Sequence, residues 1–131
     1  MCKRKALAVL AVFVAWTAMD FVIHGLILGP TYKETAAMWR PMEEMKMGLI
    51  HVVALISAAV FVSIYAKFVT EKSVKTAVKY GLLFGIGAGV SMGYGTYAVL
   101  PMPYHIALVW FLGTVCETTV GGLITGLIVR E

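Results

Sequence analysis

Two ionisable side chains, Asp20 and His24, stand four residues apart inside the apolar stretch "AMDFVIHGLILGP", residues 18–30. On a helix this spacing places both side chains on one face, where they can share a hydrogen bond or hold one ligand. His51 and Glu117 also lie within apolar stretches. Carboxylates and imidazoles bind divalent metal ions and also exchange protons, so the four residues predict one of these two chemistries.

The surrounding composition predicts an integral membrane protein. Of 131 residues, 60% are hydrophobic and 14% are charged, whereas about a quarter are charged in soluble domains. Four stretches approach the ~20 apolar residues that a bilayer core requires. We place these spans at about 5–29, 46–69, 77–100 and 103–129. The predicted fold is a single all-α domain, residues 1–131, with four transmembrane helices in an antiparallel bundle.

Basic residues predict the orientation of this bundle. With four spans both termini share one side of the membrane, and eight of the eleven Lys and Arg residues fall on it: Lys3, Arg4, Lys5, Lys67, Lys72, Lys75, Lys79 and Arg130. Because positive charge is retained in the cytoplasm, we expect both termini to be cytoplasmic. Nucleic-acid binding is not expected, since it needs a basic soluble surface.

Depth in the membrane predicts that the ionisable residues meet. At ~1.5 Å per residue, Asp20, His24 and His51 lie in the outer half of the bilayer, and Glu117 lies near the midplane. A charge in hydrocarbon costs ~2.5–3.5 kcal/mol on insertion scales, so such residues face the bundle interior and pair. We therefore expect one polar site in the outer half of the bundle.

The sequence leaves the occupant of this site open. A divalent metal ion is one candidate, and haem iron held between His24 and His51 is a less favoured one. A proton relay uses the same residue types. A polar cluster that only fixes the register of the helices is the remaining interpretation.

Soft ligands gather near the predicted outer surface. Met42, Met45 and Met47 follow one another closely, and His105 lies near the same surface. Clustered thioethers outside the cytoplasm can hold Cu(I). We favour the simpler interpretation that these methionines are flexible apolar filler at a bend.

Glycines in the third span predict close helix packing. Gly81, Gly85, Gly89 and Gly93 recur at every fourth residue, which places them on one helix face. Missing side chains there allow another backbone to approach. The approaching group is the fourth span, a second copy of the chain, or a flat cofactor.

The predicted outer loop contains a short interfacial helix. Thr31 begins a T-x-x-E capping motif, so we expect a helix that ends near Trp39. Pro41 suits the first turn of the second span. On the other side of the membrane, Thr70 or Ser73 is expected to cap the third span.

Two segments resemble a group of known proteins. "DFVIHGLILGPTYKETAAMWRPMEEMKMG" (residues 20–48) and "GLLFGIGAGVSMGYGTY" (residues 81–97) are similar to uncharacterised small bacterial membrane proteins with four predicted spans. The resemblance implies a location in the bacterial inner (cytoplasmic) membrane, and it assigns no activity. No nucleophile–base pair, phosphate-binding loop or H-E-x-x-H motif is present, so we do not expect an enzyme.

Two classes of function follow from these features. The first is a membrane protein that binds or passes a metal ion or protons through the outer-half site. The second is a non-catalytic accessory or structural subunit of a larger membrane complex. Either function suits a small chain in a lipid bilayer that forms a homo-oligomer or joins a larger complex.

Overall fold

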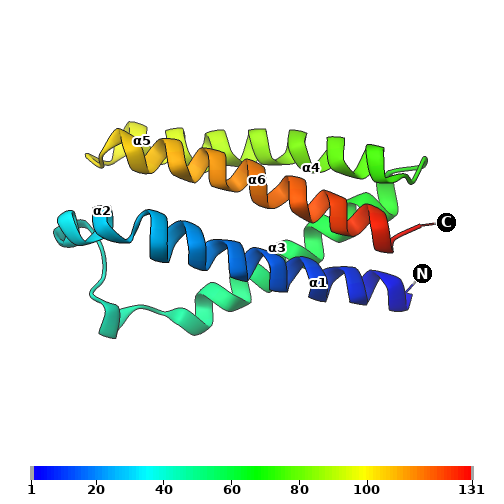
Figure 1. Ribbon diagram of the computed structural model, residues 1–131, viewed down its shortest axis with the longest axis horizontal. Coiled ribbons are helices and arrows are strands. Elements are labelled where there is room, and N and C mark those ends of the chain that lie inside the picture. The colour runs from blue at the N-terminus through cyan, green and yellow to red at the C-terminus, as the bar shows by residue number, and fades with distance from the viewer. Residues whose placement is uncertain (1, 131) are drawn as a thin grey trace.

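The computed structural model describes residues 2–130 and contains four long helical segments that run antiparallel (Figure 1). Within those residues, four segments are long and apolar enough to cross a membrane: Cys2–Ile27, Met47–Phe68, Val74–Val99 and Tyr104–Ile128. The predicted all-α bundle with four spans is therefore confirmed. Both termini lie at one end (Figure 1). We call it the terminal end and the opposite one the distal end.

Two of the four segments are interrupted by π-helical turns. The first consists of α1 (Cys2–Asp20) followed by the π-helix η1 (Phe21–Ile27). The third consists of α4 (Val74–Gly89), the π-helix η4 (Val90–Gly95) and α5 (Thr96–Val99). The other two, α3 (Met47–Phe68) and α6 (Tyr104–Ile128), are continuous α-helices. Both π-helices lie toward the distal end, where such turns often mark functional positions.

The distal connection differs from the sequence prediction. Its helix α2 (Gly29–Glu34) begins before Thr31 and has proline in its first turn, so Thr31 is not the cap. Two short 3₁₀ turns follow, η2 (Ala36–Met38) and η3 (Met42–Glu44). The backbone between them is extended at Trp39 and Pro41, on either side of Arg40, where the following proline disfavours helix. Pro41 therefore lies outside α3.

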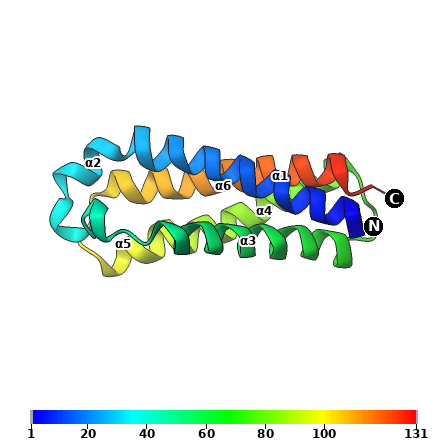
Figure 2. The ribbon, with the colours of Figure 1, turned by 90° about the horizontal axis from the view of Figure 1, so that it is seen from below.

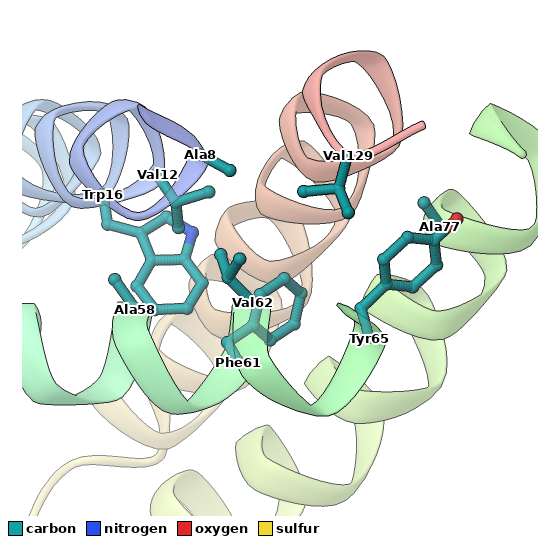
Figure 3. Packing of buried hydrophobic residues seen from close by; sticks show 9 residues of the cluster. All are labelled: Ala8, Val12, Trp16, Ala58, Phe61, Val62, Tyr65, Ala77 and Val129. Carbon is teal, nitrogen blue, oxygen red and sulfur yellow. The ribbon is translucent and has the colours of Figure 1, made fainter. Parts of the chain in front are cut away.

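A compact apolar core fills the terminal half (Figure 3). Trp16 of α1 packs edge-on against Phe61 of α3, with ring centroids 5.3 Å apart. Phe61 also contacts Tyr80 of α4 at 4.7 Å. The cluster contains Ala8, Val12, Trp16, Ala58, Phe61, Val62, Tyr65, Ala77 and Val129. At the end of this half Ser73 caps α4, since its Oγ accepts a hydrogen bond from the Thr76 N–H at 3.0 Å.

The third and fourth spans meet backbone to backbone. A Cβ atom on Gly81 would overlap the backbone carbonyl of Thr118, and one on Gly93 would lie 2.6 Å from the Ala107 carbonyl oxygen. The intervening glycines, Gly85 and Gly89, also face α6. We call these four glycines the glycine seam. Because α6 fills the space beside them, no flat cofactor fits there.

The α3 helix joins the bundle only in its terminal half. Ala58 and Phe61 are fully buried, whereas Leu49, Ile50 and Val53 are exposed nearer the distal end. Figures 1 and 2 show that the distal end of α3 lies apart from α1 and α6. The distal half therefore depends mainly on contacts between the first, third and fourth spans.

Candidate functional site

Asp20 and His24 lie at the junction of α1 and η1. The Oδ1 atom of Asp20 is 3.7 Å from Nε2 of His24, and each side chain is 38% exposed. The His24 ring contacts the Trp110 ring of α6 edge-on at 6.5 Å. The two side chains are thus half-buried at the contact between the first and fourth spans.

Glu117 brings a second carboxyl group to this contact. Its side chain lies close enough to Asp20 for the two carboxyl groups to interact electrostatically. Two carboxyl groups form a hydrogen bond only when they hold a proton between them, because two adjacent carboxylates repel. The Glu117 Oε1 atom is buried and has no hydrogen-bond partner among the described residues. The pair is therefore a place where a proton can be held inside the spans.

His24 is linked to the distal surface through Tyr32 of α2. The His24 Nδ1 atom is 2.7 Å from the Tyr32 hydroxyl oxygen. The Trp110 indole N–H donates a hydrogen bond to the same oxygen, also at 2.7 Å. Tyr32 therefore joins the first span to the fourth.

The Tyr32 hydroxyl is held in its neutral form. Burial raises the pKa of Tyr32 above the ordinary value of 10.0, and the nearby Asp20 charge adds to this, while the hydrogen bond from Trp110 opposes it. A phenol that stays neutral keeps its hydrogen and can donate it. The hydroxyl can therefore serve as a hydrogen-bond donor to His24.

Aromatic rings cover the distal side of His24. Tyr32 packs against Trp39 with ring centroids 5.3 Å apart, and Trp39 packs against Trp110 at 6.0 Å. The Trp39 indole N–H donates to the Thr35 hydroxyl at 2.9 Å and so does not reach Tyr32. Tyr32 and Trp39 both come from the connection that the sequence predicted to be interfacial.

The terminal side of the carboxyl pair is closed. The Trp16 indole N–H donates to the Glu117 backbone carbonyl at 2.6 Å. A Cβ atom on Gly121 would lie 2.9 Å from the Trp16 Nε1 atom, so the indole rests directly on α6. Trp16 belongs to the apolar core of the terminal half, which continues from it toward the terminal end (Figure 3). The polar groups thus run from Tyr32 inward and end at Glu117.

The structure does not bring His51 to this group. Its side chain is exposed near the start of α3, and within residues 2–130 it makes no hydrogen bond, ion pair or ring contact. His51 and His24 were predicted at similar depth in the membrane, but they do not lie close together, because the distal end of α3 lies apart from α1 (Figure 1). Residues 2–130 contain no group of three or more His, Cys, Asp or Glu positioned to hold a metal ion.

The other predicted ligands are scattered over the distal surface. Met42 and Met47 are 75% and 49% exposed, and Met45 is half-buried. His105 is exposed in the first turn of α6. Copper binding by these residues stays a prediction.

Sequence reasoning missed the roles of Tyr32 and Trp110. One signal was available for Trp110, since it precedes Glu117 by two helical turns and so lies on the same face of its helix. For Tyr32 no comparable signal exists, because its position depends on how the distal connection folds back. Both residues belong to the site through hydrogen bonds that only the structure reveals.

Comparisons with known proteins do not assign this site. No family model matches the sequence, and no curated protein or solved structure matches it. Function must therefore be argued from the residues of the site.

Proposed function

We propose that this chain is a small integral membrane protein that takes up and releases protons at the Asp20–Glu117 carboxyl pair. Protons reach the pair from the distal side through Tyr32 and His24. The observation that carries the proposal is a run of four proton-exchanging side chains. His24 lies 2.7 Å from the Tyr32 hydroxyl and 3.7 Å from Asp20, and Asp20 acts electrostatically on Glu117.

The direction of the run supports a path into the membrane. Trp110, which contacts Tyr32, and Glu117 are seven residues apart on α6, or roughly 10 Å along the helix axis. A proton accepted by His24 can pass to Asp20 and then to Glu117, and no bond other than those to hydrogen changes. The 3.7 Å between His24 and Asp20 exceeds hydrogen-bonding distance, so a water molecule or a small side-chain rotation completes this step.

The geometry supports protons better than a metal ion or haem. His24 uses Nδ1 for Tyr32 and directs Nε2 toward Asp20, and no third His, Cys, Asp or Glu among residues 2–130 completes a set of metal ligands with them. The haem hypothesis needs His51 to face His24 across the iron, whereas His51 is exposed near the start of α3, whose distal end lies apart from α1 (Figure 1). A proton needs only one water molecule or a small rotation in addition to the contacts of the site.

Proton uptake by reconstituted protein tests the proposal. In liposomes with a trapped pH-sensitive dye, a pulse from alkaline to neutral pH should load about one proton per chain, since the deprotonated pair takes up the one proton that it then shares. Asp20→Asn and Glu117→Gln should abolish this uptake, and His24→Ala should slow it. Glu43→Gln, which changes an exposed carboxylate in η3, is the matched control and should take up the wild-type amount. Equal uptake by all variants would refute the proposal.

We further infer that the protein resides in a bacterial inner membrane with both termini in the cytoplasm. The terminal end supports this orientation, since α1 begins with Lys3, Arg4 and Lys5 there. Lys67 and Lys75 flank the turn at the same end. A reporter fused after residue 131 should read cytoplasmic, and one inserted at Lys33 should read periplasmic. Reversed readings would overturn the orientation.

An accessory role in a larger complex is the second candidate. It is favoured by Gly87 and Gly95, which face outward with no atom within 4 Å of an added Cβ, beside the exposed Ser91. Small residues of this kind allow another helix to approach in a membrane. Gly87→Leu with Gly95→Leu should then abolish co-purification of a partner or second copy while proton uptake persists. Unchanged co-purification would remove this candidate.

A further inference from the structure

Trp110 donates its hydrogen bond to Tyr32 and not to a carboxyl group, yet it determines how the hydrogen bonds around His24 can be directed. An indole N–H can only donate a hydrogen bond. Trp110 therefore occupies the Tyr32 oxygen as a donor, at 2.7 Å. The hydrogen of the Tyr32 hydroxyl is then left for His24 Nδ1, also at 2.7 Å.

This arrangement selects one tautomer of the His24 ring. In a neutral imidazole one nitrogen carries the hydrogen and the other accepts. With Nδ1 accepting from Tyr32, the hydrogen must be on Nε2. The Nε2 atom is the one that faces Asp20 Oδ1.

We propose that Trp110 is a positioning residue that holds His24 as the Nε2–H tautomer and so aims its hydrogen at Asp20. This inference rests on the proposed function for its consequence, because only the Nε2–H tautomer can deliver a proton to the carboxyl pair. The tautomer itself is a property of the hydrogen bonds and can be measured without any proton transfer.

Trp39 supplies a matched control within the same cluster. Its ring packs against both Tyr32 and Trp110, and its N–H donates to Thr35 instead of Tyr32. Trp39→Phe therefore removes a similar amount of ring packing and leaves the donor to Tyr32 in place. Trp110→Phe removes that donor, which frees the Tyr32 oxygen to accept a hydrogen bond from Nδ1–H. Both tautomers then have a partner.

Nitrogen-15 NMR of histidine-labelled protein in lipid tests the inference, because protonated and unprotonated ring nitrogens differ in chemical shift. The pH should be about 8, above the usual histidine titration near 6.5. The chain has three histidines, so His51→Gln and His105→Gln assign the remaining His24 signal. Wild type and Trp39→Phe should show His24 as Nε2–H. Trp110→Phe should lower the ratio of Nε2–H to Nδ1–H about tenfold, as expected for the loss of one hydrogen bond.

Three results would overturn the role of Trp110: a mixed tautomer in wild type, no change in Trp110→Phe, or the same change in Trp39→Phe. If Trp110→Phe does not fold, Tyr32→Phe must produce the same loss of tautomer preference. Proton uptake by Trp110→Phe should be slower with unchanged capacity. If the wild-type protein takes up no proton, the proposed function fails while the tautomer measurement still decides the role of Trp110.

Discussion

The terminal and distal halves of the bundle are stabilised in different ways. In the terminal half, large apolar side chains from three helices are fully buried around Phe61 and Tyr65 (Figure 3). In the distal half, α3 moves away, two helices contain π-helical turns, and hydrogen bonds link Tyr32, His24 and Trp110. Close packing restricts rotation of side chains, whereas a hydrogen-bonded chain can redirect its donors. The rigid half thus supports the half in which we propose that protons move.

The largest expected effect comes from opening the glycine seam in the terminal half. Gly81→Ala should lower the free energy of unfolding by about 3 kcal/mol, since its Cβ would overlap a backbone carbonyl that cannot move aside. Unfolding in mixed detergent micelles, followed by circular dichroism, measures the change.

Gly87→Ala is the control on the same helix. No atom lies within 4 Å of its added Cβ, so the variant should be neutral or up to about 1 kcal/mol more stable through helix propensity. Equal destabilisation by the two variants would show that glycine flexibility, and not contact with α6, makes these positions sensitive.

A smaller effect is expected at the turn of the terminal half. The Tyr65 hydroxyl donates to the Ser73 carbonyl at 3.0 Å and accepts from the Ser73 N–H at 3.1 Å. Tyr65→Phe should therefore cost about 1 kcal/mol, because the Ser73 N–H loses its acceptor while the Ser73 carbonyl keeps the hydrogen bond from the Ala77 N–H. Tyr97→Phe, at an exposed distal position, should change stability by less than about 0.5 kcal/mol. If both variants lose the same stability, the Tyr65 hydroxyl does not stabilise the terminal half more than the Tyr97 hydroxyl stabilises the distal half.

The smallest effect is expected at His51. Its exposed side chain has no partner within the described residues, so His51→Ala should alter stability by less than about 0.5 kcal/mol. Proton uptake should also be unchanged. A loss of uptake comparable to that of His24→Ala would restore His51 to the site and require α3 to close against α1.

Parts of this arrangement were predictable from sequence. The cost of ionisable groups in hydrocarbon predicts that Asp20 and His24 turn toward a neighbouring helix, and both are half-buried beside Trp110 of α6. Apolar length alone located the four spans. Fourfold spacing of glycine placed one face of the third span against a neighbouring backbone, and α6 lies there.

Other parts depend on geometry that a sequence does not record. Depth along a helix says nothing about the lateral separation of two helices, which is why His51 was placed beside His24. The residues of the π-helices η1 and η4 show no distinctive local pattern, so the sequence did not predict these turns. The link from Trp110 to Tyr32 joins residues 78 positions apart, and it forms only after the distal connection folds over the bundle.

Infrared spectroscopy can detect the proton that we propose Asp20 and Glu117 share. A protonated carboxyl group absorbs at a frequency distinct from that of a carboxylate. At neutral pH the wild-type protein should show one such band, and both Asp20→Asn and Glu117→Gln should shift or remove it. Glu43→Gln should leave the band unchanged, because its carboxylate is exposed. A wild-type spectrum without this band, or a band that persists unaltered in both variants, would contradict the account.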